Sequence, residues 1–293
     1  MLSPAEHSSY RQQGYLQLPS FLDHNWIDRL RAASDHFVTQ SRSLTTSSTM
    51  LDLEPDHSPD NPRLRRLVSP VDHHEVFREL AFEGPIAELA IELLGDPVRF
   101  HHGKLNYKWS EGGEAVKWHQ DIQFWPHTDF SPLTIGVYLD DVDDSMGPMG
   151  VFPGSHLGPL YDQYDHDGNW AGALKDEDAS ELDTDEVSWL KGPAGSVTVH
   201  NCCMIHGSMP NNSSRPRRLL LQTYSAGDSY PVSGIGANGR LGGSGGTIIG
   251  RAPNQNLTID GRSMHGAPDW SKSHAPTIFG SQQQRRGQSQ VPE

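Results

Sequence analysis

Residues 133–139 have the sequence Leu-Thr-Ile-Gly-Val-Tyr-Leu, a short strand-like run that stops at a pair of aspartates. Similar short runs follow one another from Val98 onward, separated by Gly, Pro and Asp. The expected strands are 99–109, 133–139, 150–152, 196–199 and 218–225. Several short strands with this punctuation are typical of a β-sandwich or jelly roll and not of repeated βαβ units. The sequence therefore predicts a mainly β core.

The residues before this region favour helices. Ser3-Pro4-Ala5-Glu6 is a capping box with proline at the first helical position, and the helix that it opens should end near Gly14. A short strand is expected at 15–18, and a second amphipathic helix fits residues 25–38. Residues 76–94 fit two helical pieces separated by a Gly-Pro step. We therefore expect N-terminal helices that flank the β core.

Four segments show neither the helical nor the strand periodicity of apolar residues. We expect three loops and one disordered tail, in the order 39–66, 162–186, 233–250 and 280–293. A chain of 293 residues suits one large domain, because all-β folds often reach this size undivided. We therefore expect a single domain over 1–279.

Composition limits the partners and the compartment. A formal net charge of −14 argues against nucleic acid or an anionic membrane as the main partner. The two cysteines are adjacent, at 202 and 203, so no disulfide framework exists and a reducing compartment is the simple interpretation. No apolar run approaches the roughly 18 residues that a membrane span needs, and no secretory signal is visible. We expect a soluble, cytoplasmic protein that acts on a small molecule, either as a monomer or as a homodimer.

The segment Trp118-His119-Gln120-Asp121 carries the strongest chemical signal. On an extended strand, side chains at i and i+2 share a face, so His119 and Asp121 can reach one ion. His206, between a good strand and a turn-forming run, is our choice for the third ligand. Two histidines and one carboxylate are the ligand set of non-haem Fe(II) oxygenases. Arg217, eleven residues further on (217 minus 206), could hold the far carboxylate of a 2-oxo acid in a bidentate pair.

The same residue types have other interpretations. A lone H-x-D motif is weak, and His127-Thr128-Asp129 is a second one, but it follows a proline and has the residues of a loop. His200 lies six residues before His206 (206 minus 200), and we expect a turn to keep it out of the ligand set, at most as a neighbour of the ligands. Arg63-Leu64-Arg65-Arg66 could contact an anionic substrate, but a solvated charge cluster is the simpler interpretation.

These motifs resemble the phytanoyl-CoA dioxygenase family of Fe(II)/2-oxoglutarate oxygenases, which includes ectoine hydroxylase and amino-acid hydroxylases. The resemblance runs from about residue 3 to 226 and rests, in chain order, on Gly14-Tyr15, Phe21-Leu22, 118–121, 139–142, Gly147-Pro148, 152–156, 206–208, Pro210-Asn211 and Arg217. It implies a double-stranded β-helix core, of the jelly-roll or cupin-like kind, with flanking N-terminal α-helices.

The resemblance also implies a ligand set and a reaction. Iron would be held by His119, Asp121 and His206, and Arg217 would anchor the C5 carboxylate of 2-oxoglutarate. Dioxygen is the second cosubstrate, and succinate and CO2 are the coproducts. The implied reaction is hydroxylation of a small molecule at an unactivated C–H. Related halogenases have a small residue in place of the carboxylate, so Asp121 favours hydroxylation, while desaturation and cyclisation stay open.

Three further residues come from the same resemblance or lie near its motifs. Asn106, thirteen residues before the first ligand (119 minus 106), matches a cosubstrate contact in ectoine hydroxylase. Trp125, six residues after it (125 minus 119), matches an aromatic residue that shields the iron there. Lys104 is either a further contact to cosubstrate or substrate, or a lysine whose stem snorkels along the surface.

Two functions from other classes use the same residues. A zinc-dependent cupin-like hydrolase or isomerase would activate a metal-bound water, but no obvious general base or third histidine supports it, and Arg217 would lack a role. A non-catalytic binding protein would keep the barrel without turnover, and the intact ligand set with its arginine argues against it. The identity of the substrate does not follow from the sequence.

Overall fold

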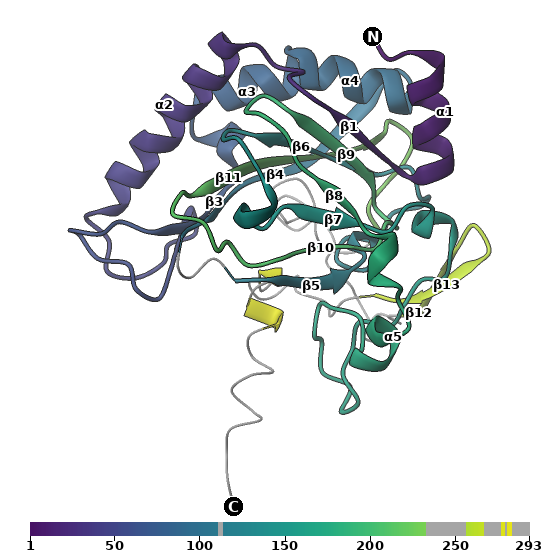
Figure 1. The fold of residues 1–293 in the computed structure, drawn as a ribbon. Helices are drawn as coiled ribbons and strands as arrows, with labels where there is room; N and C mark the ends of the chain where they lie inside the picture. The colour runs from purple at the N-terminus through teal and green to yellow at the C-terminus, as the bar shows by residue number, and fades with distance from the viewer. Residues whose placement is uncertain (111–113, 233–255, 267–276, 279, 283–293) are drawn as a thin grey trace, which may run out of the picture.

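Two antiparallel sheets form the core of the protein in a computed structural model that describes residues 1–110, 114–232, 256–266, 277–278 and 280–282 (Figure 1). The large sheet has the order β1 (Tyr15–Leu18), β9 (Val197–Asn201), β6 (Leu133–Tyr138), β11 (Arg217–Ala226), β4 (Val98–Lys108), β3 (Leu64–Val68) and β2 (Leu51–Leu53). The small sheet has the order β5 (Val116–His119), β10 (His206–Ser208), β7 (Met149–Val151) and β8 (Ser188–Leu190). A separate hairpin pairs β12 (Asn256–Ile259) with β13 (Arg262–His265).

The helices lie mainly on one side of the large sheet, opposite the small sheet (Figure 1). They are α1 (Pro4–Gln13), α2 (His24–Ser41), α3 (Glu75–Phe82), α4 (Pro85–Leu94) and the short α5 (Asp176–Ser180). Five 3₁₀ turns occur among the described residues: η1 (Pro70–Asp72), η2 (Asp121–Gln123), η3 (Asp144–Met146), η4 (Ser155–Leu157) and η5 (Thr184–Glu186). The predicted mainly β core with flanking N-terminal helices is therefore confirmed.

Alternation along the central strands separates the apolar core under the helices from a mixed, partly polar interior between the sheets. On β4, Leu105 and Tyr107 belong to the apolar core under the helices, and the Tyr107 hydroxyl is 3.0 Å from Oγ of Ser34 on α2. On β11, Tyr224 also belongs to this apolar core, and its hydroxyl donates to the carbonyl of Ala81 on α3 at 2.9 Å. Burying each large apolar side chain stabilises the fold by about 1.5–3 kcal/mol. The intervening residues of both strands face the small sheet, where polar side chains such as Lys104 and Arg217 line a cavity together with Leu219.

Local signals placed the N-terminal elements correctly. The Ser3 hydroxyl accepts from the Glu6 amide at 3.2 Å, and Gly14 ends α1 in the left-handed region at φ +77°. The break between α3 and α4 falls at the Gly84-Pro85 step, as predicted. These features depend on neighbours in sequence, so the sequence alone determines them.

Segments 39–66 and 162–186 were predicted as loops, and both contain regular structure. β2 and most of β3 lie in the first, where Leu51 pairs with Leu67. The second contains α5 and η5. The three-residue strands β8 and β10 were also not foreseen, because elements this short have no period and exist through their pairing partners. Segment 233–250 and most of the tail 280–293 lie outside the described residues, so those two expectations and the single-domain prediction stay predictions.

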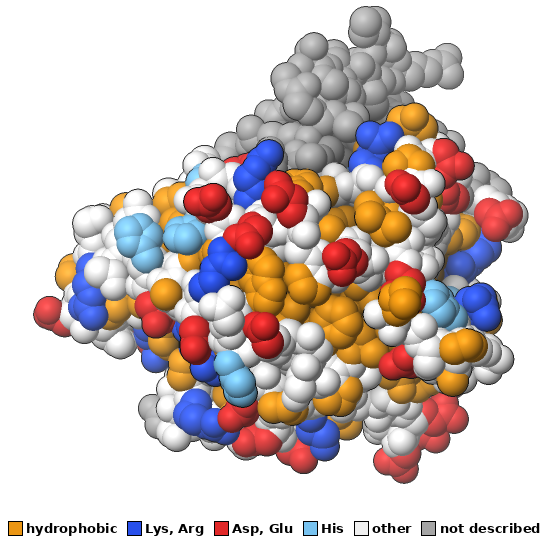
Figure 2. Space-filling view, turned by 90° about the horizontal axis from the view of Figure 1, so that it is seen from above, with side chains coloured by type: hydrophobic (Ala, Val, Ile, Leu, Met, Phe, Trp, Pro, Cys, Tyr) orange, Lys and Arg blue, Asp and Glu red, His pale blue; other side chains and the backbone are white. Residues whose placement is uncertain are grey.

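The helical face carries apolar side chains at its surface. Figure 2 looks down on this face and shows an apolar area bordered by acidic and basic side chains. Phe82 of α3 and Ile91 of α4 are among the exposed large apolar residues. Among the described residues, no helix has the length and apolar character needed to cross a membrane.

Candidate active site

Three side chains from two parts of the small sheet converge between the sheets. His119 ends β5 and His206 begins β10, and the two residues are direct partners in the antiparallel register. Asp121 starts the turn η2, which is tied down by a 2.9 Å bond from the Ile122 amide to the Cys202 carbonyl. Among the described residues, His119, Asp121 and His206 form one group whose ligand atoms all lie within 4.8 Å of one another.

Backbone hydrogen bonds orient both imidazoles. Nδ1 of His119 lies 2.8 Å from the carbonyl of Lys117, and Nδ1 of His206 lies 3.0 Å from that of Met204. Each Nδ1 must therefore carry the proton, which leaves Nε2 with a free lone pair. These Nε2 atoms lie 3.7 and 3.9 Å from Oδ1 of Asp121. The donor set therefore fits a metal ion held by two nitrogens and one oxygen.

Electrostatics keep the three groups in the protonation states that a metal needs. Burial lowers the pKa of His119 to about 4. Burial, together with the neighbouring His119 and His200, holds the pKa of His206 well below its usual value. Burial alone would raise the pKa of Asp121, but its interactions with His206, His200 and Lys104 outweigh it, so this pKa lies well below its usual range. At neutral pH the imidazoles are neutral and the carboxylate is ionised, as metal binding requires.

Arg217 lies in the same cavity as the three ligand residues. It starts β11, is 4% exposed and donates from Nη1 to the carbonyl of Gly147 at 2.7 Å. Its Nε is buried and has no hydrogen-bond partner among the described residues. A buried guanidinium with an unused donor is a ready site for a carboxylate. The geometry thus fits the cosubstrate end of a 2-oxo acid site.

Lys108 and Ser208, two other residues near Arg217, were not predicted as site residues. Lys108 is 2% exposed, and its Nζ donates to Oγ of Ser208 at 2.7 Å and to the Met209 carbonyl at 2.5 Å. Burial, and then the charge of Arg217, hold the pKa of Lys108 well below its usual value. Because Lys108 donates to Ser208, the hydroxyl proton of Ser208 is free to point into the cavity. Only the pairing of β4 with β11 and the placement of β10 bring these residues together.

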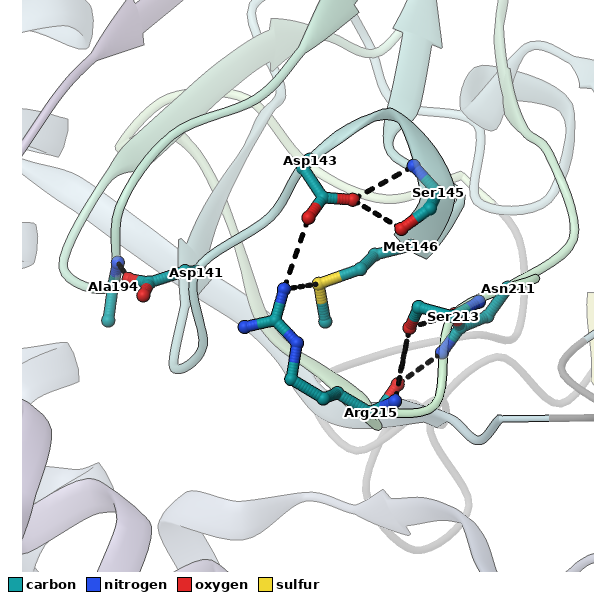
Figure 3. A network of polar contacts seen from close by, with 8 residues as sticks. All are labelled: Asp141, Asp143, Ser145, Met146, Ala194, Asn211, Ser213 and Arg215. Carbon is teal, nitrogen blue, oxygen red and sulfur yellow. Dashed lines mark hydrogen bonds and ion pairs between the residues drawn. The ribbon is translucent and has the colours of Figure 1, made fainter.

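Two loops close this end of the site through a network of polar contacts (Figure 3). Arg215 donates from Nη2 to Asp143 at 3.1 Å and lies 3.4 Å from the sulfur of Met146. Asn211 donates to the carbonyls of Arg215 at 2.7 Å and Lys108 at 2.8 Å. The loop before β7 is thereby tied to the loop before β11. The network fixes the backbone around Gly147, the hydrogen-bond partner of Arg217.

A second polar group lies along the inner face of β4. Lys104 and Asn106 line the cavity, and Oδ1 of Asn106 accepts from Nε of Arg66 at 3.1 Å. Arg66 is buried, and its Nη2 has no partner among the described residues. Burial and then Arg66 lower the pKa of Lys104 to about 8. The interpretation of Arg66 as part of a solvated cluster is therefore wrong, and Lys104 faces the cavity instead of the outer surface.

The remaining predicted residues lie farther out. Trp125 packs with Ile122 and Cys202, and its ring centroid lies 5.9 Å from that of His102. It is not among the described residues that line the cavity, so its shielding role stays a prediction. In the second H-x-D motif, His127 is bonded through Nδ1 to the Trp125 carbonyl at 2.7 Å and belongs to no metal-type group of described residues.

Comparisons with known proteins agree with this geometry. Residues 10–219 match the family Phytanoyl-CoA dioxygenase (PhyH). The chain belongs to this family. It is 31% identical to a probable alpha-ketoglutarate-dependent hypophosphite dioxygenase of Stutzerimonas stutzeri, over 80% of this chain and 82% of that protein. It is 32% identical to an L-proline trans-4-hydroxylase of Streptomyces griseoviridis, over 76% of this chain and 86% of that protein.

Solved structures support the fold. EctD from S. alaskensis, crystallised with 2-oxoglutarate and 5-hydroxyectoine, has a TM-score of 0.63 at 24% identity, covering 77% of this chain and 76% of its own. SnoK, a non-heme alpha ketoglutarate dependent carbocyclase from nogalamycin biosynthesis, has a TM-score of 0.63 at 22% identity, covering 78% of this chain and 86% of its own.

Family membership and the donor set together define the enzyme class. The chain is a non-haem dioxygenase that depends on iron and 2-oxoglutarate and uses dioxygen as cosubstrate. The zinc hydrolase and the non-catalytic binding protein, the two alternatives drawn from the sequence, find no support among these relatives.

Proposed function

We propose that this dioxygenase oxidises a small anionic molecule beside an iron ion held by His119, Asp121 and His206. The neutral Nε2 atoms and the ionised carboxylate described above support this ligand set. When bound, iron, 2-oxoglutarate and dioxygen supply the oxidising chemistry, with succinate and CO2 as coproducts. The residues of the chain hold the reactants in place, exclude water and match their charges.

The end of the cavity near Arg217 would take the far carboxylate of 2-oxoglutarate. Arg217 offers its unused Nε, and Ser208 offers a hydroxyl whose oxygen already accepts from Lys108. In a site shielded from water, such charge-assisted hydrogen bonds are strong. Asn106, on the same inner face of β4, is a further candidate contact, although its Oδ1 is occupied by Arg66.

The buried charges of Lys104 and Arg66 are the observation that supports an anionic substrate. Neither side chain lies within ion-pair distance of a carboxylate among the described residues, and Arg66 keeps a buried donor without a partner. Asp121, the acidic residue lining this cavity, is already assigned to iron. Buried charges are normally paired, so these two cations favour an anionic ligand. Hypophosphite and L-proline, named for two relatives, each carry an anionic group.

A substrate screen tests this proposal. The iron-loaded enzyme is incubated with 2-oxoglutarate, dioxygen and small molecules in matched pairs, each an anion and its neutral amide or ester, and succinate is measured. We expect anions to stimulate succinate formation and their neutral partners to fail. Lys104→Met should raise KM for the anion, while Lys117→Met, a change at a half-exposed lysine on β5, should not. Equal stimulation by neutral partners would exclude the anionic class.

We further infer a cytoplasmic location and a monomer or homodimer. Cys202 and Cys203 are both free thiols with their sulfurs 3.8 Å apart, which suits a reducing compartment. Light scattering of the purified protein would separate monomer from dimer, and cell fractionation would test the compartment.

A further inference from the structure

We propose that His200 is a positioning residue of the iron site, whose Nε2–H donates to Oδ2 of Asp121 and would leave only Oδ1 of that carboxylate to hold iron. The inference rests on the proposed ligand set. It goes beyond that set because His200 lies outside the ligand motifs, and the sequence predicted it at most as a neighbour of the ligands.

His200 lies on the inner side of the large sheet, facing the same cavity. It belongs to β9, where it pairs with Thr134 of β6 and Tyr15 of β1, and it is 1% exposed. Its ring centroid lies 4.4 Å from that of His206. Neither of its ring nitrogens has a hydrogen-bond partner among the described residues, whereas each ligand imidazole is bonded through Nδ1 to a backbone carbonyl. A fully buried imidazole without a partner is costly unless a nearby group uses it.

The two oxygens of Asp121 have different neighbours. Oδ1 faces Nε2 of both His119 and His206. Oδ2 instead lies 3.6 Å from Nε2 of His200, a distance that a small adjustment of either side chain converts into a hydrogen bond. One oxygen of the carboxylate is thus available to a metal and the other to an imidazole donor.

This division matters for the open positions of the metal. A facial set of three protein ligands leaves three positions, which a chelating 2-oxo acid and dioxygen can fill. A carboxylate that turned to bind through both oxygens would take one of them. A donor that holds Oδ2 prevents this turn and fixes the direction of Oδ1, as hydrogen bonds behind metal ligands generally do.

His200 does not extend the ligand set itself. The group of ligand atoms within 4.8 Å of one another comprises His119, Asp121 and His206, and His200 is not part of it. Its backbone is also held in place independently, because both neighbouring strands pair with β9 through this residue. The side chain is therefore fixed at one side of Asp121.

Two variants separate the hydrogen bond from the volume of the ring. His200→Phe keeps an aromatic ring and removes the donor, whereas His200→Gln keeps an N–H donor. Iron(II) affinity is measured without oxygen, and 2-oxoglutarate binding is then followed by the absorption band that its chelate with iron(II) produces. We expect His200→Phe to weaken iron binding roughly 10- to 100-fold and to shift the band, and His200→Gln to stay within a few-fold of the parent. His127→Phe, at a buried histidine outside the cavity, is the matched control and should bind iron normally.

The other outcomes overturn the proposal. If His200→Phe binds iron as the parent does and changes only KM for substrate, the residue is a substrate contact. If both His200 variants lose iron equally, it is a fourth ligand. If His200→Phe does not fold, His200→Met replaces it. Normal iron binding by His200→Met would likewise overturn the proposal. Failure of the parent protein to bind iron is a different result, which would overturn the proposed function.

Discussion

Lys108 lies directly opposite Arg217 across the antiparallel pair of β4 and β11. Both side chains are buried, and neither forms an ion pair among the described residues. Like charges directly opposite each other destabilise a sheet, so the arrangement costs stability in the absence of an anion. A carboxylate bound at Arg217, which lines the cavity, would offset this cost.

Lys108→Met should therefore weaken 2-oxoglutarate binding. The substitution keeps an unbranched side chain of similar length and removes the donor to Ser208. Hydrogen bonds to charged groups contribute about 1.5–3 kcal/mol, so KM for 2-oxoglutarate should rise roughly 10-fold or more with a smaller change in kcat. Steady-state succinate formation measures both constants. Lys117→Met on β5 is the control, and an unchanged KM in Lys108→Met would remove the residue from the anchor.

The two H-x-D motifs offer an internal comparison. Asp121→Ala removes one of three predicted iron ligands and should abolish both iron retention and succinate formation. Asp129→Asn changes the second motif, whose carboxylate accepts from Ser131 and Ser229, and should leave both intact. Metal analysis after gel filtration, together with succinate measurement, tests the pair. Full turnover by Asp121→Ala would exclude Asp121 as a ligand.

The parts of the site that the sequence predicted are those encoded locally or by a family motif. His119 and Asp121 follow from their spacing of two, and His206 and Arg217 from their place between strand and turn signals. The burial of Arg66 and the placement of Lys108 did not follow, because both depend on strand register, and His200 was expected at most as a neighbour of the ligands. Arg66 lies behind Asn106, which lines the cavity, because the two residues pair across β3 and β4, and most of β3 was predicted as loop.

The fold shows the same limit. Alternation and turn residues identified the long strands of the large sheet to within one or two residues at each end. β10 has only three residues, and it is held by β5 on one side and β7 on the other. No local period can reveal a strand that exists through its two neighbours. The order of the strands is likewise a property of long-range pairing.

Lys104 gives the enzyme a predicted pH dependence. Burial lowers the pKa of Lys104 to about 8, so the side chain loses its charge as the pH rises through that value. An anionic substrate would then be held less well, and kcat/KM should fall above about pH 8. Lys104→Arg should move this fall to higher pH, because arginine stays protonated. Identical pH profiles of kcat/KM for the parent and this variant would show that Lys104 does not cause the pH dependence.

The same group affects stability with a definite sign. The folded protein releases the Lys104 proton near pH 8, whereas an unfolded lysine keeps it to about 10.4. Between these values the unfolded chain binds more protons, so the contribution of Lys104 to the free energy of unfolding rises with pH. Urea unfolding of the parent and Lys104→Met across this window measures the contribution. As the pH rises through this window, the free energy of unfolding of the parent should increase relative to that of Lys104→Met.

Gly147 has a left-handed backbone and also lies too close to another segment for a side chain. Gly168 has the same backbone conformation without the close contact, so the two effects can be measured separately. Gly147 has φ +63°, and a Cβ there would lie 2.2 Å from the Met209 carbonyl oxygen, whereas Gly168 has φ +79° and no atom within 4 Å. Gly168→Ala should therefore cost only the left-handed backbone, about 1–2 kcal/mol. Gly147→Ala should cost more in urea unfolding and should also raise KM for 2-oxoglutarate, because the Gly147 carbonyl accepts from Arg217. Equal losses of stability in the two variants would mean that the loops before β7 and β11 separate easily and do not hold Arg217 in place.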